Sequence, residues 1–86
     1  NYMTDEELIE MGNDSEVILG SRAFSRTVDK LVDSTMQNFL NSTTDQSEKR
    51  EQYYRHYRAL VDIVATLKQH VAVRDEIHAK TKENEE

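Results

Sequence analysis

Residues 53–71, YYRHYRALVDIVATLKQHV, decide the fold because their apolar side chains recur with a seven-residue period. The recurring residues are Tyr53, Tyr57, Leu60, Val64, Leu67 and Val71, separated by alternating steps of four and three. Such spacing lines up side chains on one face of an α-helix and is typical of a helix that packs against another helix. It predicts a long amphipathic helix that continues to about Lys82, beyond the point where Arg74 and His78 interrupt the apolar pattern.

A second amphipathic helix precedes this stretch. Its apolar face consists of residues at steps of three and four: Phe24, Val28, Leu31, Val32, Thr35 and Phe39, widened by Met36 and Leu40. The pattern predicts a helix from about Ser21 to Leu40. The polar sequence NSTTDQSE, residues 41–48, predicts the turn between the helices, with Asp45 and Glu48 or Thr43 and Gln46 as alternative capping pairs.

The N-terminal segment is expected to be helical but interrupted. Thr4-Asp5-Glu6-Glu7 has the form of a capping box. It predicts a short helix that ends at Gly12-Asn13, a pair suited to a left-handed helix end. A further helical turn is expected at 14–19, with a break at Gly20-Ser21. The apolar residues Leu8, Ile9 and Met11 are expected to fold back on the hairpin of the two longer helices.

Composition favours an all-α fold in a single domain. The chain has 86 residues, two glycines, no proline and no cysteine, so neither disulfides nor a thiolate zinc site are expected. We divide it into an acidic N-terminal helical segment (1–20), an antiparallel two-helix hairpin (21–82) and an acidic tail (83–86). No segment has the roughly 20 apolar residues that cross a bilayer, so we expect a cytoplasmic protein without membrane contact.

Charge argues against broad attraction to nucleic acid. The net charge is −6, and residues 1–20 carry six acidic residues and no basic one. Tyr53–Arg58 interleaves aromatic and basic residues as a base-stacking surface does. A helical projection, however, places Tyr53 and Tyr57 in the apolar stripe and turns Arg55 and Arg58 away. This favours core tyrosines, while a DNA-binding module that uses Arg50, Arg55 and Arg58 is kept as an alternative.

No catalytic, metal-binding or cofactor-binding residue is predicted. His56, His70 and His78 include no pair at the i, i+4 spacing that places two ligands on one metal. His56 and His70 lie at the margins of the apolar stripe, where half-buried structural histidines are expected. No glycine-rich phosphate loop occurs, and no serine lies beside an evident base. We therefore expect a protein that is not an enzyme.

The apolar faces of the two helices are broader than a two-helix contact uses. Six residues are left over and are the predicted protein-interaction residues: Met36, Leu40, Tyr54, Val61, Ile63 and Val71. They predict association with another protein or with copies of the chain, as a dimer or a larger ring. Two hairpins that form a four-helix arrangement are the simplest closed solution.

The stretch 18–71 also resembles a protein family. The motifs ILGSRAF, TTDQSEKRE and YRALVDIVATL resemble small uncharacterised helical-hairpin proteins encoded among the head and DNA-packaging genes of tailed bacteriophages. Tyr53 and Tyr54 stand where such proteins often carry Leu-Trp. The resemblance implies a role in virion assembly or DNA packaging, in the host cytoplasm or the virion, and transfers no catalytic residue.

Two functions follow as hypotheses. The first is a non-enzymatic helical assembly protein of a tailed phage, for instance a small-terminase-like packaging factor. No helix-turn-helix with a basic recognition helix is evident, so such a protein would bind DNA through ring geometry, through another chain, or not at all. The second is a small acidic regulator that binds and blocks a host or cellular protein through residues 5–16. The plainer interpretation of that segment is a solvated amphipathic helix.

Overall fold

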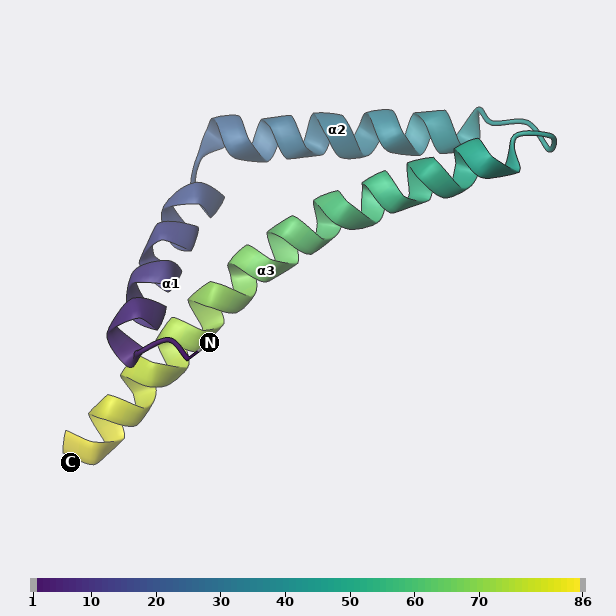
Figure 1. The fold of residues 1–86 in the computed structure, drawn as a ribbon. Helices are drawn as coiled ribbons and strands as arrows, with labels where there is room; N and C mark the ends of the chain where they lie inside the picture. The colour runs from purple at the N-terminus through teal and green to yellow at the C-terminus, as the bar shows by residue number, and fades with distance from the viewer. Residues whose placement is uncertain (1, 86) are drawn as a thin grey trace.

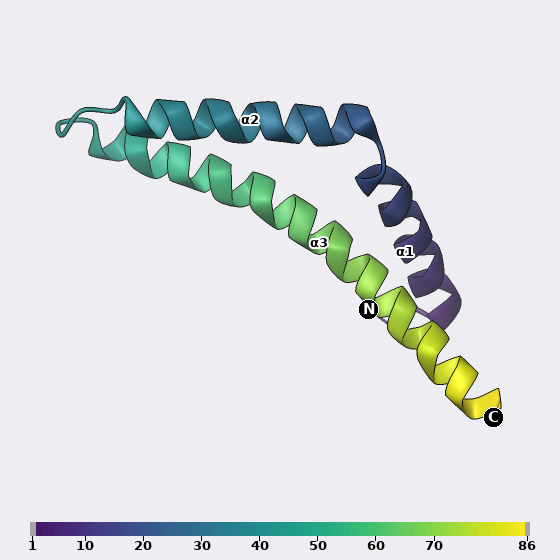
Figure 2. The same ribbon diagram turned by 180° about the vertical axis from the view of Figure 1, so that it is seen from behind.

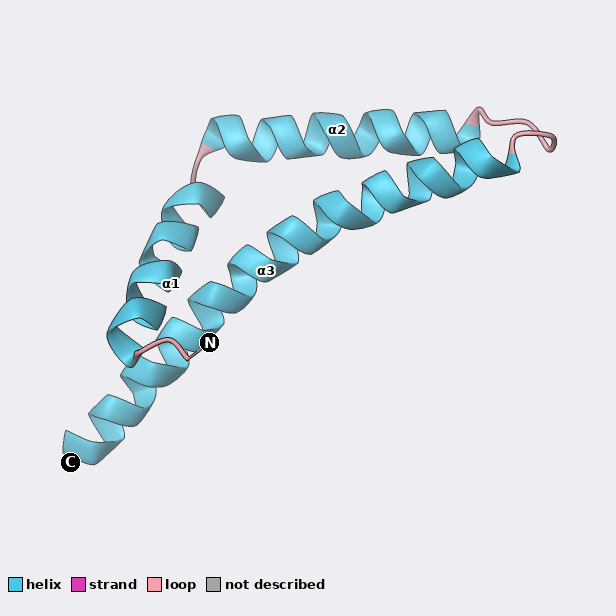
Figure 3. Cartoon of the chain, viewed as in Figure 1, coloured by secondary structure: helices cyan, strands magenta, loops and turns pink. Residues whose placement is uncertain are grey.

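The computed structural model describes residues 2–85, which form three α-helices and no strand. The helices are α1 (Asp5–Leu19), α2 (Arg22–Leu40) and α3 (Ser47–Glu85), labelled in Figure 1 and coloured by secondary structure in Figure 3. Helix makes up 87% of the structure, so the expected all-α class is confirmed. Asn1 and Glu86, the outer ends of the expected N-terminal segment and acidic tail, lie outside the described residues.

α1 begins at the capping box that the sequence predicts. The Glu7 backbone N–H donates to Thr4 Oγ1, and the Thr4 backbone N–H donates to Glu7 Oε1, each over 3.1 Å. These bonds satisfy N–H groups that the start of a helix leaves unpaired. The bond from the Thr4 backbone, followed by one from its hydroxyl, lowers the pKa of the Glu7 carboxyl below its ordinary value.

Gly12 does not end α1, which corrects the expectation of a short helix followed by a separate turn. The helix is continuous to Leu19, and no described glycine has a left-handed φ. Gly12 is buried because it lies against α3. A Cβ at this position would be 2.5 Å from the Arg74 Cβ and 2.9 Å from the His70 carbonyl oxygen. The glycine therefore allows two helices to approach each other closely.

α2 spans almost the range that the sequence predicts. Ser21 is its N-cap, and Ser21 Oγ accepts a hydrogen bond of 3.2 Å from the Phe24 backbone N–H. Gly20, which ends α1, has a helical φ of −80°. The expected break at Gly20-Ser21 is confirmed, and the serine cap makes it without a left-handed glycine.

The connection between α2 and α3 is short and internally hydrogen-bonded. Ser42 Oγ donates to the Phe39 carbonyl oxygen over 2.6 Å. The Thr43 backbone N–H donates to Gln46 Oε1, and the Gln46 backbone N–H donates to the Thr43 carbonyl oxygen, each over 3.0 Å. Of the two predicted capping pairs, the structure thus joins Thr43 with Gln46. Asp45 accepts a hydrogen bond from the Thr43 hydroxyl, which lowers the pKa of the Asp45 carboxyl.

α3 is a single helix of 39 residues, about 58 Å long at 1.5 Å per residue. It extends to Glu85, slightly beyond the expected end near Lys82. Its last two turns are exposed, as a helix without a neighbour at its end should be. An ion pair of 3.5 Å joins Glu76 and Lys80 on successive turns. The length of α3 sets the elongated shape, which measures 62 × 28 × 20 Å.

α2 and α1 flank different halves of α3, and both run antiparallel to it (Figures 1 and 2). α2 lies next to α3 near the connecting turn and separates from it towards the other end. α1 closes the gap and packs against α3 more closely than α2 does. The stretch of α3 that α2 does not reach is therefore covered by α1 of the same chain, except for the last two turns.

The described residues include no buried apolar side chain. The residues expected in the core are half-buried at best; these are Phe24, Val28, Tyr53, Tyr57, Leu60, Val64 and Leu67. Leu31 and Phe39 are 47% and 39% exposed, which corrects the expectation that they point inward. Leu31 lies in the middle of α2, where the helix has begun to diverge from α3. Phe39 lies beside the turn, where the two helices are adjacent, and it is exposed because it lines an open hollow between them.

Candidate interaction surface

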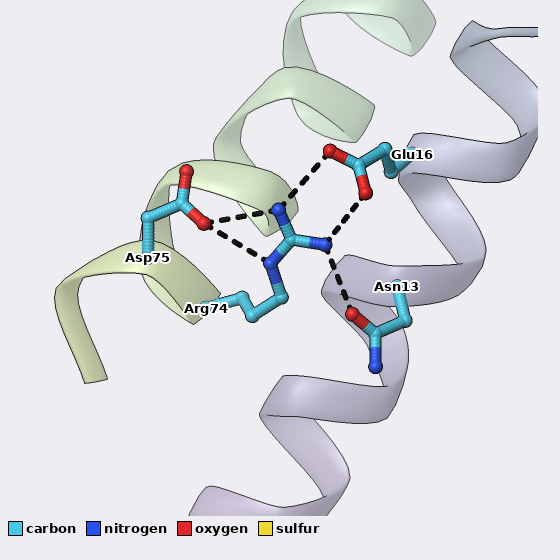
Figure 4. A network of polar contacts seen from close by, with 4 residues as sticks. All are labelled: Asn13, Glu16, Arg74 and Asp75. Atoms are coloured by element: carbon cyan, nitrogen blue, oxygen red, sulfur yellow. Dashed lines mark hydrogen bonds and ion pairs between the residues drawn. The ribbon is translucent and has the colours of Figure 1, made fainter. Parts of the chain in front are cut away.

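The crossing of α1 and α3 is held by one arginine (Figure 4). The Arg74 guanidinium donates to Asn13 Oδ1 over 2.9 Å and to the two Glu16 carboxylate oxygens over 3.0 and 3.1 Å. It also donates two bonds to Asp75 Oδ1, over 3.0 and 3.1 Å. All five guanidinium N–H donors are thus engaged, and the side chain is only 11% exposed. Arg74 therefore fixes α1 on α3 and has no donor left for a phosphate.

The same network shifts the pKa of both charged partners. Hydrogen bonds from Arg74, reinforced by its positive charge, lower the pKa of the Glu16 carboxyl below its ordinary 4.5. Hydrogen bonds to Glu16, and then to Asp75, raise the pKa of the Arg74 guanidinium further above its already high value. Both shifts favour the ionised pair at neutral pH. The sequence showed Arg74 only as an interruption of the apolar pattern, because its partners on α1 lie 58 to 61 positions away along the chain.

A second polar contact lies beside this network. Ser15, which is 2% exposed, is hydrogen-bonded through Oγ to His70 Nδ1 over 2.9 Å. His70 is half-buried, as expected from its place at the margin of the apolar stripe. His56 is exposed, which corrects the expectation that it is half-buried too. α1 does not reach the part of α3 that carries His56, so none of residues 2–85 covers that side of the helix.

Three adjoining hollows follow the line along which α2 and α3 diverge, and together they form what we call the α2–α3 groove. The hollow nearest the turn has a volume of about 140 Å³ and is lined by Met36, Phe39, Leu40, Tyr53, Tyr54 and Tyr57. The middle hollow, of about 290 Å³, is lined by Val28, Val32, Leu60, Val61, Val64, Ala65 and Lys68. The third, of about 260 Å³, shares Val28, Val64 and Lys68 with the middle one and adds Leu19, Phe24, Ser25 and Asp29.

Four of the six predicted interaction residues line this groove. Met36, Leu40 and Tyr54, which are 41%, 65% and 55% exposed, border the hollow nearest the turn. Val61 is half-buried in the middle hollow. Ile63, 50% exposed, lies on another side of α3, in a separate hollow with Ala59 and Leu67. Val71, which is half-buried, lines none of these hollows.

Several exposed apolar residues were not among the predicted interaction residues. Phe39 lines the groove although its position at the centre of the α2 stripe suggested burial. On α1, Val17 and Ile18 are 74% and 40% exposed. Adjacent residues of a helix point in different directions, so Val17 and Ile18 could not both face α3. The helical period of the sequence therefore indicated that at least one of these two side chains would be exposed.

Two of the basic residues near the turn form hydrogen bonds or ion pairs within the chain. Arg50 donates to the Thr43 carbonyl oxygen, and Arg58 pairs with Asp62 over 3.0 Å. Tyr53 and Tyr57 are half-buried, and only Tyr54 of the three is exposed. Of the three tyrosines, a single ring thus lies on the exposed surface, next to the exposed Arg55, whereas a base-stacking surface presents several rings.

One further hollow of the described surface is polar. A hollow of about 590 Å³ on the outer face of α2 is lined only by polar and charged residues: Arg26, Asp29, Lys30, Asp33, Ser34, Gln37 and Asn38. Within residues 2–85, no three histidine, aspartate or glutamate side chains come together as metal ligands would. Over the same residues, no helix combines the length and apolar character needed to cross a bilayer.

No protein-family model, curated protein or solved structure matches this chain. Its geometry and its residues are therefore the basis for the function proposed below.

Proposed function

We propose that this chain is a non-enzymatic helical assembly protein that acts by packing its α2–α3 groove against another protein chain, in the first place against a second copy. On this proposal α2 and α3 form a two-helix hairpin that is completed by oligomerisation. The observation that carries the proposal is the lack of any buried apolar side chain in residues 2–85, together with a continuous apolar groove. Large exposed apolar surfaces of this kind are typical of protein–protein contact sites.

The amount of exposed surface supports the same proposal. The chain exposes 7000 Å², whereas a compact monomer of this mass exposes about 5,300 Å². The radius of gyration is 18.0 Å, compared with about 12 Å for a compact domain of this length. The chain is therefore too open to be a self-sufficient globular unit, and association would remove the excess surface from water.

The resemblance to tailed-phage proteins provides the biological setting of the proposal. It favours a role in virion assembly or DNA packaging, for instance as a small-terminase-like factor. Such a protein would act in the host cytoplasm or in the virion. The saturated Arg74 and the net charge of −6 favour contact with protein over direct contact with DNA. In that setting the chain would reach DNA only through a ring of copies or through another chain.

The proposal is tested by measuring molar mass as a function of concentration. Sedimentation velocity between about 1 and about 100 µM should show a dimer or larger species whose population rises with concentration. A chain that stays monomeric at about 100 µM would refute the proposal. A DNA titration at low salt, about 50 mM, should show no detectable binding, because phosphate contacts are strongest there.

One observation favours a second candidate function, a small acidic regulator of a host or cellular protein. α1 presents Asp5, Glu6, Glu10 and Asp14 as exposed carboxylates and contains no basic residue. Because the Arg74 network fixes α1 on α3, this acidic face is a formed surface that could bind a basic protein. Reversing the charge of Glu10 and Asp14 should abolish capture of such a partner while leaving helicity and self-association unchanged. If capture survives the reversal, the regulator hypothesis fails.

A further inference from the structure

The α2–α3 groove has the form of one layer of a four-helix bundle. Two antiparallel helices present apolar side chains to the same open side, with no third helix over them. Two such layers placed face to face bury both apolar faces, as in bundles built from two helical hairpins. The groove follows α3 from Tyr53 to Lys68, so its midpoint lies near Leu60 and Val61.

The excess of exposed surface has the size that an obligate dimer needs. The chain exposes 7000 Å², about 1,700 Å² more than a compact monomer of its mass. Obligate homodimers bury about 2,000 to 5,000 Å² in total, or about 1,000 to 2,500 Å² for each chain. A second copy seated on the groove would therefore account for the open shape without any further partner.

Charge is distributed unevenly along the 62 Å length of the molecule. Residues 47–58, next to the turn, carry four basic and two acidic residues. At the opposite end, residues 75–85 carry four acidic and two basic residues, and α1 beside them carries six acidic residues and no basic one. A parallel pair of chains would place the two acidic ends together. An antiparallel pair centred on the groove midpoint places the acidic α1 of each copy, whose Gly12 lies beside Arg74, near the basic residues 47–58 of the other copy.

We propose that two copies of this chain pair antiparallel, groove to groove, about a two-fold axis near Leu60 and Val61. This inference rests on the proposed self-association and deepens it by assigning the partner, the surface and the orientation. An isologous contact of this kind uses the same surface of both copies. No such surface is left exposed for a third copy, so the assembly stops at the dimer. The four helices α2 and α3 of both copies form a bundle, and the two α1 helices lie at opposite ends of the assembly.

The arrangement fixes distances between equivalent residues of the two copies. Val61 lies next to the axis, so the two Val61 side chains should be near neighbours. Glu83 lies about 22 residues from the axis, so at 1.5 Å per residue the two Glu83 positions should be about 65 Å apart. In a parallel pair, equivalent residues of neighbouring helices would lie within about 20 Å of each other, since packed helix axes are about 8–10 Å apart.

The chain has no cysteine, so single introduced cysteines report these distances without interference. A spin label on the Glu83→Cys variant should give a distance distribution centred near 65 Å by double electron–electron resonance. Under mild oxidation the Val61→Cys variant should form a disulfide-linked dimer. The Ser34→Cys variant, on the outer polar face of α2, is the matched control and should stay unlinked. If Val61→Cys loses helicity, Leu60→Cys, which also lies next to the axis in the same hollow, takes its place.

Sedimentation of the same samples separates the possible failures. A dimer with a Glu83 distance below about 25 Å would overturn the antiparallel orientation and leave self-association standing. A dimer that links through Ser34→Cys and not through the groove cysteines would overturn the groove as the contact surface. A monomer at about 100 µM would overturn both this inference and the proposed function.

Discussion

The close approach of α1 and α3 at Gly12 makes Gly12→Ala the most informative single substitution. The added Cβ would lie 2.5 Å from the Arg74 Cβ, 2.9 Å from the His70 carbonyl oxygen and 3.2 Å from the Arg74 Cδ. Favourable separations between carbon atoms are about 3.5–4.0 Å. The first two atoms belong to or adjoin the backbone and cannot turn aside, so α1 must move away from α3 by about 1 Å.

The expected magnitude is the balance of three terms. Replacing a glycine by alanine inside a helix favours the helix by about 1 kcal/mol. Overpacking at a tight contact costs about 1–3 kcal/mol, and Gly12 lies at the upper end because two contacts are too short. The displacement also stretches the Ser15–His70 hydrogen bond, worth about 1 kcal/mol. The net expectation is a loss of about 3 kcal/mol in the free energy of unfolding.

Gly20→Ala is the matched control. Gly20 has helical φ and ψ, and a Cβ there would come no closer than 3.4 Å to another atom, the Glu16 carbonyl oxygen. This variant should be neutral or more stable by about 0.4–1 kcal/mol, because alanine restricts the unfolded chain. Urea unfolding followed by circular dichroism, at one fixed protein concentration, compares the two variants. A Gly12→Ala chain as stable as the parent would refute the close packing of α1 on α3.

Three further predictions concern the ends and the anchoring of α1. Because the pKa of Glu16 is lowered from 4.5 in the folded chain, its stabilising effect is complete above that pH and is lost as the pH falls through the lowered value. Thermal melts between about pH 3 and 6 should show a larger loss of stability in the parent than in Glu16→Gln, which keeps the contributions of Glu7 and Asp45; equal pH dependence would contradict it. Ser15→Ala removes the partner of His70 and should cost about 1 kcal/mol in urea unfolding, and a neutral result would mean that the bond is not formed in solution. Thr4→Ala removes the α1 cap and should cost about 1 kcal/mol, with faster amide exchange at Glu7 as the local signature; unchanged exchange there would count against the cap.

The helices themselves could be predicted from local sequence because their signals are local. The capping box at Thr4, the N-cap at Ser21 and the polar run at 41–48 each act within a few residues, and each marks a helix boundary in the structure. The seven-residue repeat from Tyr53 likewise predicted one long helix. Its side chains are half-buried, as a helix with one covered face requires.

The relative placement of the helices could not be predicted in the same way. A glycine followed by asparagine is consistent with a helix end, and also with a point of close contact. Only the residues opposite Gly12, on a helix more than 50 positions away, distinguish the two. Arg74 presents the same difficulty. A charged residue in an apolar repeat is expected to be exposed to solvent unless its partners, here on α1, are known. The exposure of Leu31 depends on the angle between α2 and α3, and that of Phe39 on the open hollow between them, neither of which local spacing sets.

The way in which α1 joins the other two helices has a mechanical consequence. Short links tie α2 to α1 at one end and to α3 at the other, and the Arg74 network ties α1 to α3, so the three segments form the sides of a triangle (Figure 1). The angles of a triangle are fixed by the lengths of its sides, so this arrangement does not depend on side chains that fill the space between the helices. The chain can therefore keep a recessed apolar surface in a fixed shape before anything occupies it, which reduces the ordering entropy that binding would otherwise cost.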